Sequence, residues 1–266
     1  MSKEPFKTTA NDALNFEERL GPLIFEPAAE ELLSRIINLP ASAILEIACG
    51  TGRVTKHLKE NFPGASIIAT DINPVMMELA QKQLTGISFQ VADAQQLPFA
   101  YNSFDLVVNQ FGLMFLPEKQ TGVNEALRVL QPGGHFVFTT WDSTASMPLF
   151  KLIIDDIFAP VLKHVDTSRF YTPFSLHNPD ELNDYLKQAG FSEYKVSLMQ
   201  FKGKAHSPGQ IIDSYFLNHP WGKQVKESYP DSYENTIKTM EQGLIQQFGA
   251  GAFEFELRAL LGIGKK

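Results

Sequence analysis

The stretch EIACGTGRV, residues 46–54, joins an apolar run to a segment with helical spacing. Gly50 and Gly52 lack side chains, so the backbone can turn sharply here and approach a ligand closely. A helix that begins near Thr51 offers unpaired N–H groups in its first turn. The stretch predicts a strand, a tight turn and a helix, and the turn either holds a nucleotide-type ligand or needs glycine for its own geometry.

Apolar runs and helical patterns alternate on both sides of this turn. Strands are predicted at 43–48, 65–71, 87–93, 104–111 and 135–142, the last introduced by a turn at 131–134. Helices are predicted between and before them at 27–39, 51–61, 74–84 and 118–130, with Asn73 or Asp71 as the cap of the third. This alternation is typical of an α/β protein with a parallel sheet, whose ligands lie at the carboxyl ends of the strands.

The rhythm changes after Asp142. Helical spacing covers 147–165, a helix that Asn178 caps and Gly190 ends is predicted at 178–191, and strands are predicted at 194–201 and 253–264. The stretch from 205 to 251 is polar and aromatic, with three prolines as breakers. We expect a helical segment at 1–40, a core at 41–142, and the rest of the same domain at 143–266, with lid insertions at about 143–177 and 206–250.

Composition limits the classes of function. The chain has 266 residues, 44% of them hydrophobic, and a net charge of -7, which disfavours nucleic acid as the main partner. No apolar run is long enough to span a membrane, and the first residues lack the apolar core of a secretory signal. Cys49 is the single cysteine, so an internal disulfide is excluded, and no metal-site spacing is present. A cytoplasmic monomer or homodimer that acts on a small molecule is expected.

Polar residues stand at the ends of three further predicted strands. Asp71 follows Gly52 by 19 residues, the position from which an acid can bind both hydroxyls of a ribose. Asp93, followed by Ala94, is placed to accept from the amine of an adenine. The fourth strand ends in Asn109, Gln110 and Phe111, near the reversal of strand order. Each could instead be a helix cap or a solvated turn, but together they favour a nucleoside site.

The turn also distinguishes among nucleotides. A dinucleotide loop would place glycine or alanine where this chain has Thr55, and the Lys-Ser or Lys-Thr of a phosphate-binding loop is missing. Glu46 would repel a phosphate; it suits a ligand with an ammonium or sulfonium group, or a network that holds the loop. An NAD-dependent oxidoreductase is therefore the less favoured alternative.

Five motifs carry a resemblance to a known family: ILEIACGTGRVT (44–55), IIATDINPVMMELA (67–80), VADAQQLPF (91–99), FDLVVNQFGLMFLPEK (104–119) and EALRVLQPGGHFVFTTWD (125–142). The chain resembles the class I S-adenosylmethionine-dependent methyltransferases, in particular the small-molecule group that includes the ubiquinone/menaquinone biosynthesis methyltransferases. The resemblance implies a Rossmann-like seven-stranded sheet in the order 3-2-1-4-5-7-6, with the last strand antiparallel and helices on both faces. It also implies S-adenosyl-L-methionine as cofactor, S-adenosyl-L-homocysteine as product, and in-line methyl transfer to a small-molecule acceptor.

The resemblance assigns roles to individual positions. The loop would lie under the methionine part, Asp71 would hold the ribose, and Asp93 would read the adenine amine. Phe16 stands where tyrosine is common in a segment that folds over the cofactor, and Ala48 stands where glycine is frequent. The full set of expected cofactor residues is Phe16, Glu46, Ala48, Cys49, Gly50, Thr51, Gly52, Asp71, Ile72, Met76, Asp93, Ala94, Gln95, Asn109, Gln110, Phe111 and Phe115.

Catalytic residues are not fixed by these motifs. Methyl transfer needs a base only when the acceptor holds its proton at neutral pH, and histidine is the usual candidate. His164, His177, His206 and His219 fall in the expected lid segments, where exposed polar residues are also common. Trp141 is placed for the substrate side or fills the layer between sheet and helices. A protein that binds the cofactor without catalysis is the remaining alternative.

Overall fold

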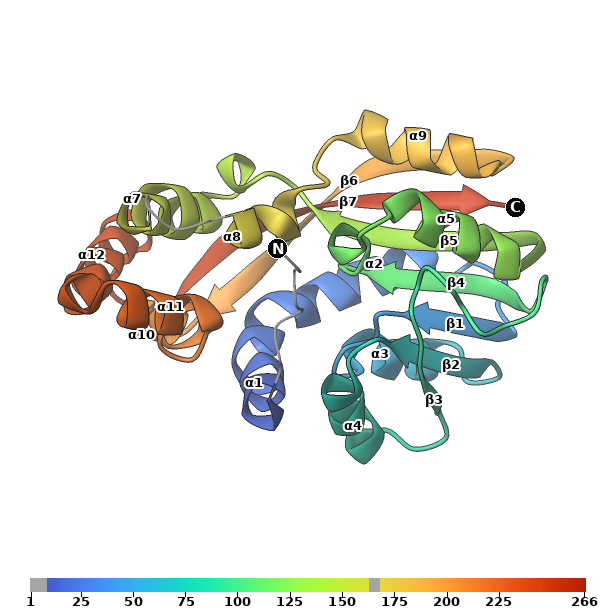
Figure 1. The fold of residues 1–266 in the computed structure, drawn as a ribbon, viewed down its shortest axis with the longest axis horizontal. Coiled ribbons are helices and arrows are strands. Elements are labelled where there is room, and N and C mark those ends of the chain that lie inside the picture. The colour runs from blue at the N-terminus through green and yellow to red at the C-terminus, as the bar shows by residue number, and fades with distance from the viewer. Residues whose placement is uncertain (1–8, 163–167) are drawn as a thin grey trace.

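The computed structural model describes residues 9–162 and 168–266, and its centre is a seven-stranded sheet (Figure 1). The strand order is β3-β2-β1-β4-β5-β7-β6, the order that the family resemblance implies. The strands are β1 (Ala43–Ile47), β2 (Ser66–Asp71), β3 (Ser88–Val91), β4 (Phe104–Gln110), β5 (Leu130–Trp141), β6 (Glu193–Ala205) and β7 (Phe253–Lys265). The first five run parallel, and β7 is antiparallel to both of its neighbours.

The fifth strand begins earlier than predicted. Leu130 already pairs with Phe104, and the register then shifts so that the next pair joins His135 to Leu106. The glycine-containing turn expected at 131–134 is therefore a bulge inside β5, with Gly133 in a left-handed conformation at φ +83°. A local turn signal does not reveal that the residues on both sides of it pair with the same strand.

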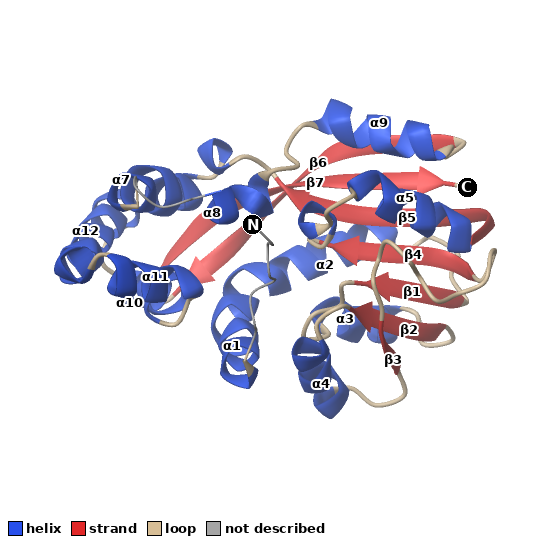
Figure 2. Cartoon of the chain, in the orientation of Figure 1, coloured by secondary structure: helices blue, strands red, loops and turns tan. Residues whose placement is uncertain are grey.

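Helices cover both faces of the sheet (Figure 2). Residues with apolar helical spacing form α2 (Glu26–Ile36), α3 (Arg53–Asn61), α4 (Pro74–Gln83), α5 (Lys119–Val129) and α9 (Pro179–Ala189). Asn73 caps α4 by accepting from the N–H groups of Val75 and Met76, which settles the choice between Asn73 and Asp71. Asn178 caps α9, and Gly190 ends it at φ +98°, both as predicted.

The N-terminal segment is helical where the structure describes it. Helix α1 (Ala10–Asn15) is closed by a capping box between Thr9 and Asp12. It runs into a π-helix, η1 (Phe16–Phe25), which contains Pro22 and continues directly as α2. Proline has no N–H to donate, so the hydrogen bond that a regular α-helix would form from residue 22 is missing. We call Phe16–Phe25 the strap.

The segments after β5 and β6 form a helical cap (Figure 1). Strands β6 and β7 continue beyond Trp141, the last residue of β5, as a two-stranded ribbon. The ribbon carries α10 (Pro208–Ile212), η6 (Asp213–Leu217), α11 (Pro220–Ser228) and α12 (Pro230–Phe248). The three prolines expected as breakers are first residues of helices, where a missing N–H costs nothing.

The helix expected at 147–165 is divided into shorter pieces. They are η3 (Thr144–Ser146), α6 (Pro148–Phe150), the π-helix η4 (Lys151–Phe158) and α7 (Ala159–Val161), and η4 packs against α12. Residues 163–167 lie outside the described part. Further along are α8 (Ser168–Tyr171) and η5 (Thr172–Phe174). Within the described ranges, none of the helices has both the length and the apolar character that a membrane span requires.

Candidate active site

The turn after β1 contains three left-handed residues. Ala48, Gly50 and Gly52 have φ values of +58°, +55° and +87°. A Cβ on Gly52 would stand 2.9 Å from Ala80 Cβ and 2.9 Å from Leu84 Cδ1, so packing against α4 requires glycine there. A Cβ on Gly50 would meet, among the described atoms, Met76 Cε at 3.9 Å. Both glycines therefore have the backbone conformation that the turn needs; Gly52 is in addition required by packing, whereas the space beside Gly50 is open.

Asp71, at the end of β2, holds this turn in place. Its Oδ2 accepts from the Gly50 N–H at 2.7 Å and its Oδ1 accepts from the Asn73 N–H at 2.8 Å. Burial raises the pKa of the Asp71 carboxyl, and the backbone hydrogen bonds oppose that shift. Ile72, the next residue, is 67% exposed beside it. The end of β2 therefore presents a buried carboxylate next to an open apolar surface.

Glu46 lies behind the turn. It is 2% exposed, and its Oε2 accepts a 2.5 Å hydrogen bond from the hydroxyl of Thr55. Burial raises the pKa of Glu46 to about 8, with a further increase from the charge of Asp71. These contacts correspond to the second role left open by the sequence, a network that holds the loop. They also explain why threonine occupies the third small position of the motif.

Side chains at the ends of β3 and β4 form hydrogen bonds with nearby backbone groups. Asp93 Oδ1 accepts from the Gln95 N–H at 2.8 Å, and Gln95 Oε1 accepts from the Glu118 N–H at 2.9 Å, while Ala94 is buried. Buried Asn109 donates to the Ile47 carbonyl at 3.3 Å.

The same Asn109 accepts from the N–H groups of Gly112 and Leu113. A Cβ on Gly112 would stand 2.6 Å from Ala48 Cβ, so the turns after β1 and β4 are in direct contact. Within the described part of the chain, the buried Nε2 of Gln110 has no hydrogen-bond acceptor. Asn109 is thus a tie between strands, and Gln110 carries an unused donor.

Aromatic rings gather beside this contact. Phe111, at φ +56°, stacks on Trp141 with ring centroids 3.9 Å apart and planes at 6°. Phe25 of the strap meets both rings edge-on, and Phe16 lies 4.6 Å from Phe25. Phe115, one of the expected cofactor residues, is 57% exposed in η2 (Leu113–Phe115). We call Phe16, Phe25, Phe111 and Trp141 the aromatic stack; it joins the strap to the ends of β4 and β5.

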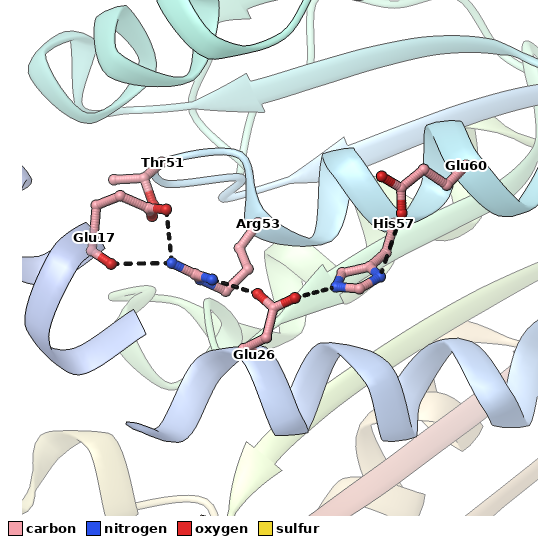
Figure 3. Close-up of polar contacts among 6 residues, drawn as sticks. All are labelled: Glu17, Glu26, Thr51, Arg53, His57 and Glu60. Carbon is pink, nitrogen blue, oxygen red and sulfur yellow. Dashed lines mark hydrogen bonds and ion pairs between the residues drawn. The ribbon is translucent and has the colours of Figure 1, made fainter. Parts of the chain in front are cut away.

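An ion-pair network fastens the strap to the glycine turn (Figure 3). Arg53, the first residue of α3, pairs with Glu17 at 2.7 Å and with Glu26. The Thr51 hydroxyl donates to Glu17 Oε2 at 2.6 Å, and His57 Nε2 bonds to Glu26 at 2.9 Å. Burial opposes ionisation of Glu26, but its bonds to Arg53 and His57 outweigh burial and lower its pKa. The sequence alone gives no sign of this network, because its partners stand 27–36 residues apart and no motif links them.

The candidate histidines are scattered. His164 lies outside the described residues. His206 is exposed after β6, and its N–H donates to Gln210. His219 is buried beside the Tyr215 ring, and burial lowers its pKa to about 4. His177 lies near the end of β5, where its Nδ1 is 2.7 Å from the Phe174 carbonyl oxygen. Among the candidate histidines that the structure describes, His177 lines a cleft beside the sheet.

Comparison with known proteins agrees with this geometry. A family model described as a methyltransferase domain matches residues 45–138. The chain is 30% identical over 183 residues to the ubiquinone/menaquinone biosynthesis C-methyltransferase UbiE of Geotalea daltonii, covering 65% of this chain and 76% of that protein. It is 36% identical over 207 residues to an uncharacterized protein of Mycobacterium tuberculosis, covering 76% and 72%.

The chain belongs to the class I S-adenosylmethionine-dependent methyltransferases. Solved structures share its fold at low identity. A possible histamine N-methyltransferase of Thermotoga maritima has a TM-score of 0.56 and 20% identity, with 96% of this chain and 98% of that one covered. Phosphoethanolamine N-methyltransferase 2 of Haemonchus contortus has a TM-score of 0.60 and 16% identity, with 98% and 58% covered. This methyltransferase uses S-adenosylmethionine as its cofactor, so the NAD-dependent alternative is set aside.

Proposed function

We propose that this methyltransferase moves a methyl group to a small-molecule acceptor by in-line displacement. The observation that carries the proposal is the contact between the glycine turn and the turn that holds Phe111, made by Ala48 and Gly112. It sets the turn after β1 beside the buried rings of Phe111 and Trp141 at the ends of β4 and β5. A donor on the turn and an acceptor beside the rings would then face each other. The cofactor supplies a methyl group activated by its sulfonium.

The residues present fit such a cofactor. Gly50 leaves space where a side chain would stand, and Ile72 offers an exposed apolar surface for a base. Each oxygen of Asp71 has a lone pair beyond the one used by the backbone, so the carboxylate can still accept from ribose hydroxyls. Asp93 and Ala94 at the end of β3 would take the adenine amine, and Gln110 would donate toward the methionine end.

The remaining expected positions, Phe16, Cys49, Thr51, Met76, Gln95 and Phe115, would complete that surface. Glu46 and Asn109 would act through the turn, since their described contacts are all internal. We therefore treat these two as residues that position the site.

The chain itself would contribute alignment and exclusion of water. Holding two reactants in line can contribute on the order of 7 to 11 kcal/mol. The face of Phe111 or Phe115 near the sulfonium would add about 0.5 to 2 kcal/mol of cation–π stabilisation. The strap closes the same side through Phe16 and Phe25, which limits the access of water.

The net charge of -7 supports a small-molecule acceptor over nucleic acid. The names of two relatives also support a small-molecule acceptor: UbiE, and the demethylmenaquinone methyltransferase of Clavibacter sepedonicus. The second is 35% identical to this chain over 162 residues, covering 56% of this chain and 65% of that protein.

Two measurements test the proposal. Calorimetric titration with S-adenosylhomocysteine should show one site per chain. Incubation of the protein with a metabolite extract and methyl-labelled S-adenosylmethionine should then give a labelled small molecule by mass spectrometry. Cofactor binding with label found only in protein or nucleic acid would refute the small-molecule acceptor. Binding with no labelled product in any fraction would favour a protein that binds the cofactor without catalysis.

A further inference from the structure

A carboxylate of the strap lies on the glycine turn (Figure 3). Glu17 Oε2 accepts from the Thr51 hydroxyl at 2.6 Å, and Glu17 Oε1 accepts from the Arg53 guanidinium at 2.7 Å. Thr51 stands between Gly50 and Gly52 in the turn, and Arg53 is the first residue of α3. Both oxygens of Glu17 are therefore bound to the turn that we assign to the cofactor.

The same two donors suit a carboxylate of the ligand. S-adenosylmethionine has a carboxylate at its methionine end, and the turn is expected to lie under that part of the molecule. Hydrogen bonds from a guanidinium or a hydroxyl to an ionised carboxylate are among the strongest in proteins. A second carboxylate at these donors would repel the first, because like charges a few ångströms apart cost free energy. Glu17 and the ligand carboxylate therefore cannot bind Thr51 and Arg53 at the same time.

Arg53 has further bonds that do not involve the Glu17 carboxylate. It pairs with Glu26 at the start of α2, and its Nη2 donates to the backbone carbonyl of Glu17 at 3.0 Å. The Glu17 side chain is 19% exposed, so it lies at the border with solvent. Departure of the Glu17 carboxylate would thus leave Arg53 paired and the strap attached, which avoids the cost of an unpaired buried charge.

We propose that Glu17 is an internal competitor of the cofactor: it fills the carboxylate subsite formed by Thr51 and Arg53 until the methionine carboxylate displaces it. The inference rests on the proposed function above. Thr51 and Arg53 exchange one carboxylate for another, so no hydrogen bond of theirs is lost when the ligand enters. Glu17 lowers the apparent affinity for every ligand that carries this carboxylate, the methyl donor and its product alike.

The first test measures binding by calorimetry with two ligands. S-adenosylhomocysteine carries the carboxylate, whereas 5′-methylthioadenosine has the same nucleoside and sulfur but no amino-acid chain. Glu17→Gln removes the competing charge and keeps the size of the side chain. It should tighten S-adenosylhomocysteine binding about tenfold, the gain expected on removing a competitor that fills the subsite about 90% of the time. Binding of 5′-methylthioadenosine should stay as in wild type.

Glu18→Gln is the matched control. Glu18 is the next residue of the strap and is exposed, and its substitution removes the same charge. It should leave both affinities unchanged. An equal gain for the two ligands in Glu17→Gln would show that Glu17 only holds the strap over the site, and would overturn the inference. An unchanged or weaker affinity of Glu17→Gln for S-adenosylhomocysteine would overturn it as well.

A double-mutant cycle with Thr51→Val tests the exchange at the shared donor. In wild type the Thr51 hydroxyl binds a carboxylate before and after the ligand enters, so Thr51→Val should weaken S-adenosylhomocysteine binding by less than about threefold. In Glu17→Gln the hydroxyl exchanges a neutral amide for a carboxylate, so the same substitution should weaken binding about fivefold to tenfold. An equal factor in both backgrounds would contradict the exchange. Unchanged 5′-methylthioadenosine binding confirms that each variant keeps a folded site.

The inference and the proposed function fail in different ways. If wild type binds S-adenosylhomocysteine and methylates a small molecule, but Glu17→Gln shows no gain in affinity, the inference alone is refuted. If wild type, Glu17→Gln and Glu18→Gln all bind neither S-adenosylhomocysteine nor 5′-methylthioadenosine, the cofactor site is not at the glycine turn, and the proposed function is refuted together with the inference.

Discussion

Replacing Gly52 by alanine should destabilise the fold by about 2 to 5 kcal/mol. An L residue in the left-handed region costs about 1 to 2 kcal/mol, and Gly52 has φ +87°. The new Cβ would also stand 2.9 Å from both Ala80 and Leu84, and such overpacking costs about 1 to 3 kcal/mol. Urea denaturation followed by circular dichroism measures the free energy of unfolding directly.

Two other glycines supply controls for this experiment. A Cβ added at Gly64 would meet no described atom beyond its chain neighbours within 4 Å, so Gly64→Ala should leave the protein as stable as wild type or about 0.4 to 1 kcal/mol more stable. Gly50 has φ +55° but no close neighbour, so Gly50→Ala should cost only the conformational part, about 1 to 2 kcal/mol.

The same series separates packing from ligand binding. A Cβ on Gly50 would enter the space assigned to the cofactor, so Gly50→Ala should weaken S-adenosylhomocysteine binding at least about tenfold, equivalent to about 1.4 kcal/mol. If Gly52→Ala unfolds at the same urea concentration as Gly64→Ala, the packing argument is wrong. If Gly50→Ala binds the product as tightly as wild type, Gly50 does not face the cofactor.

Three further changes test other parts of the site. Glu46 has a pKa of about 8 in the folded protein against 4.5 in the unfolded chain, so the free energy of unfolding should fall by up to about 1.4 kcal/mol per pH unit as the pH rises from 4.5 to 8. Glu46→Gln should abolish this fall. If the free energies of unfolding of wild type and Glu46→Gln, measured in urea, change in parallel with pH, the expectation is wrong. Arg53→Met should destabilise the protein by about 2 to 4 kcal/mol and speed amide exchange in the strap. The control is Arg35→Met, which breaks an exposed ion pair with Glu31 and should cost under about 0.5 kcal/mol. Equal costs for the two variants would show that the network does not stabilise the fold. Asp71→Asn should weaken S-adenosylhomocysteine binding about tenfold by calorimetry, and unchanged affinity would exclude Asp71 from the site.

The sheet could be predicted because its signals are local. Apolar runs with helices between them define the five parallel strands within about two residues at most ends, and Asn73, Asn178 and Gly190 end or begin helices by contacts within their own segments. Insertions were expected at about the positions of the cap, but the bounds of its helices could not be predicted, because these helices are stabilised by packing on one another and on the ribbon. The sequence predicts Pro208, Pro220 and Pro230 as helix breakers, because a proline that starts a helix and one that interrupts a helix give the same local sequence signal.

The residues of the site likewise fall into those that local motifs predict and those that only the tertiary structure brings together. Gly50, Asp71 and Phe111 were expected at strand ends, and the structure places all three around the contact between two turns. The internal tie made by Asn109 was not expected, because the carbonyl of Ile47 that it satisfies belongs to another strand. The role of Arg53 was not expected for the same reason, since its carboxylate partners are Glu17 of the strap and Glu26 at the start of α2. Which buried polar groups meet is a property of the tertiary structure.

The position of β7 between β5 and β6 has a consequence for synthesis. Strand β6 ends at Ala205, but its partner begins at Phe253, so at about 5 to 20 residues per second the ribosome exposes β6 and the edge of β5 without their partner for several seconds. Exposed strand edges are templates for aggregation. A chain stopped before residue 253 would lack an inner strand, leaving β6 detached from the sheet. We therefore expect nascent chains of this length to depend on chaperones more than chains stopped after β5, where the five parallel strands are already complete.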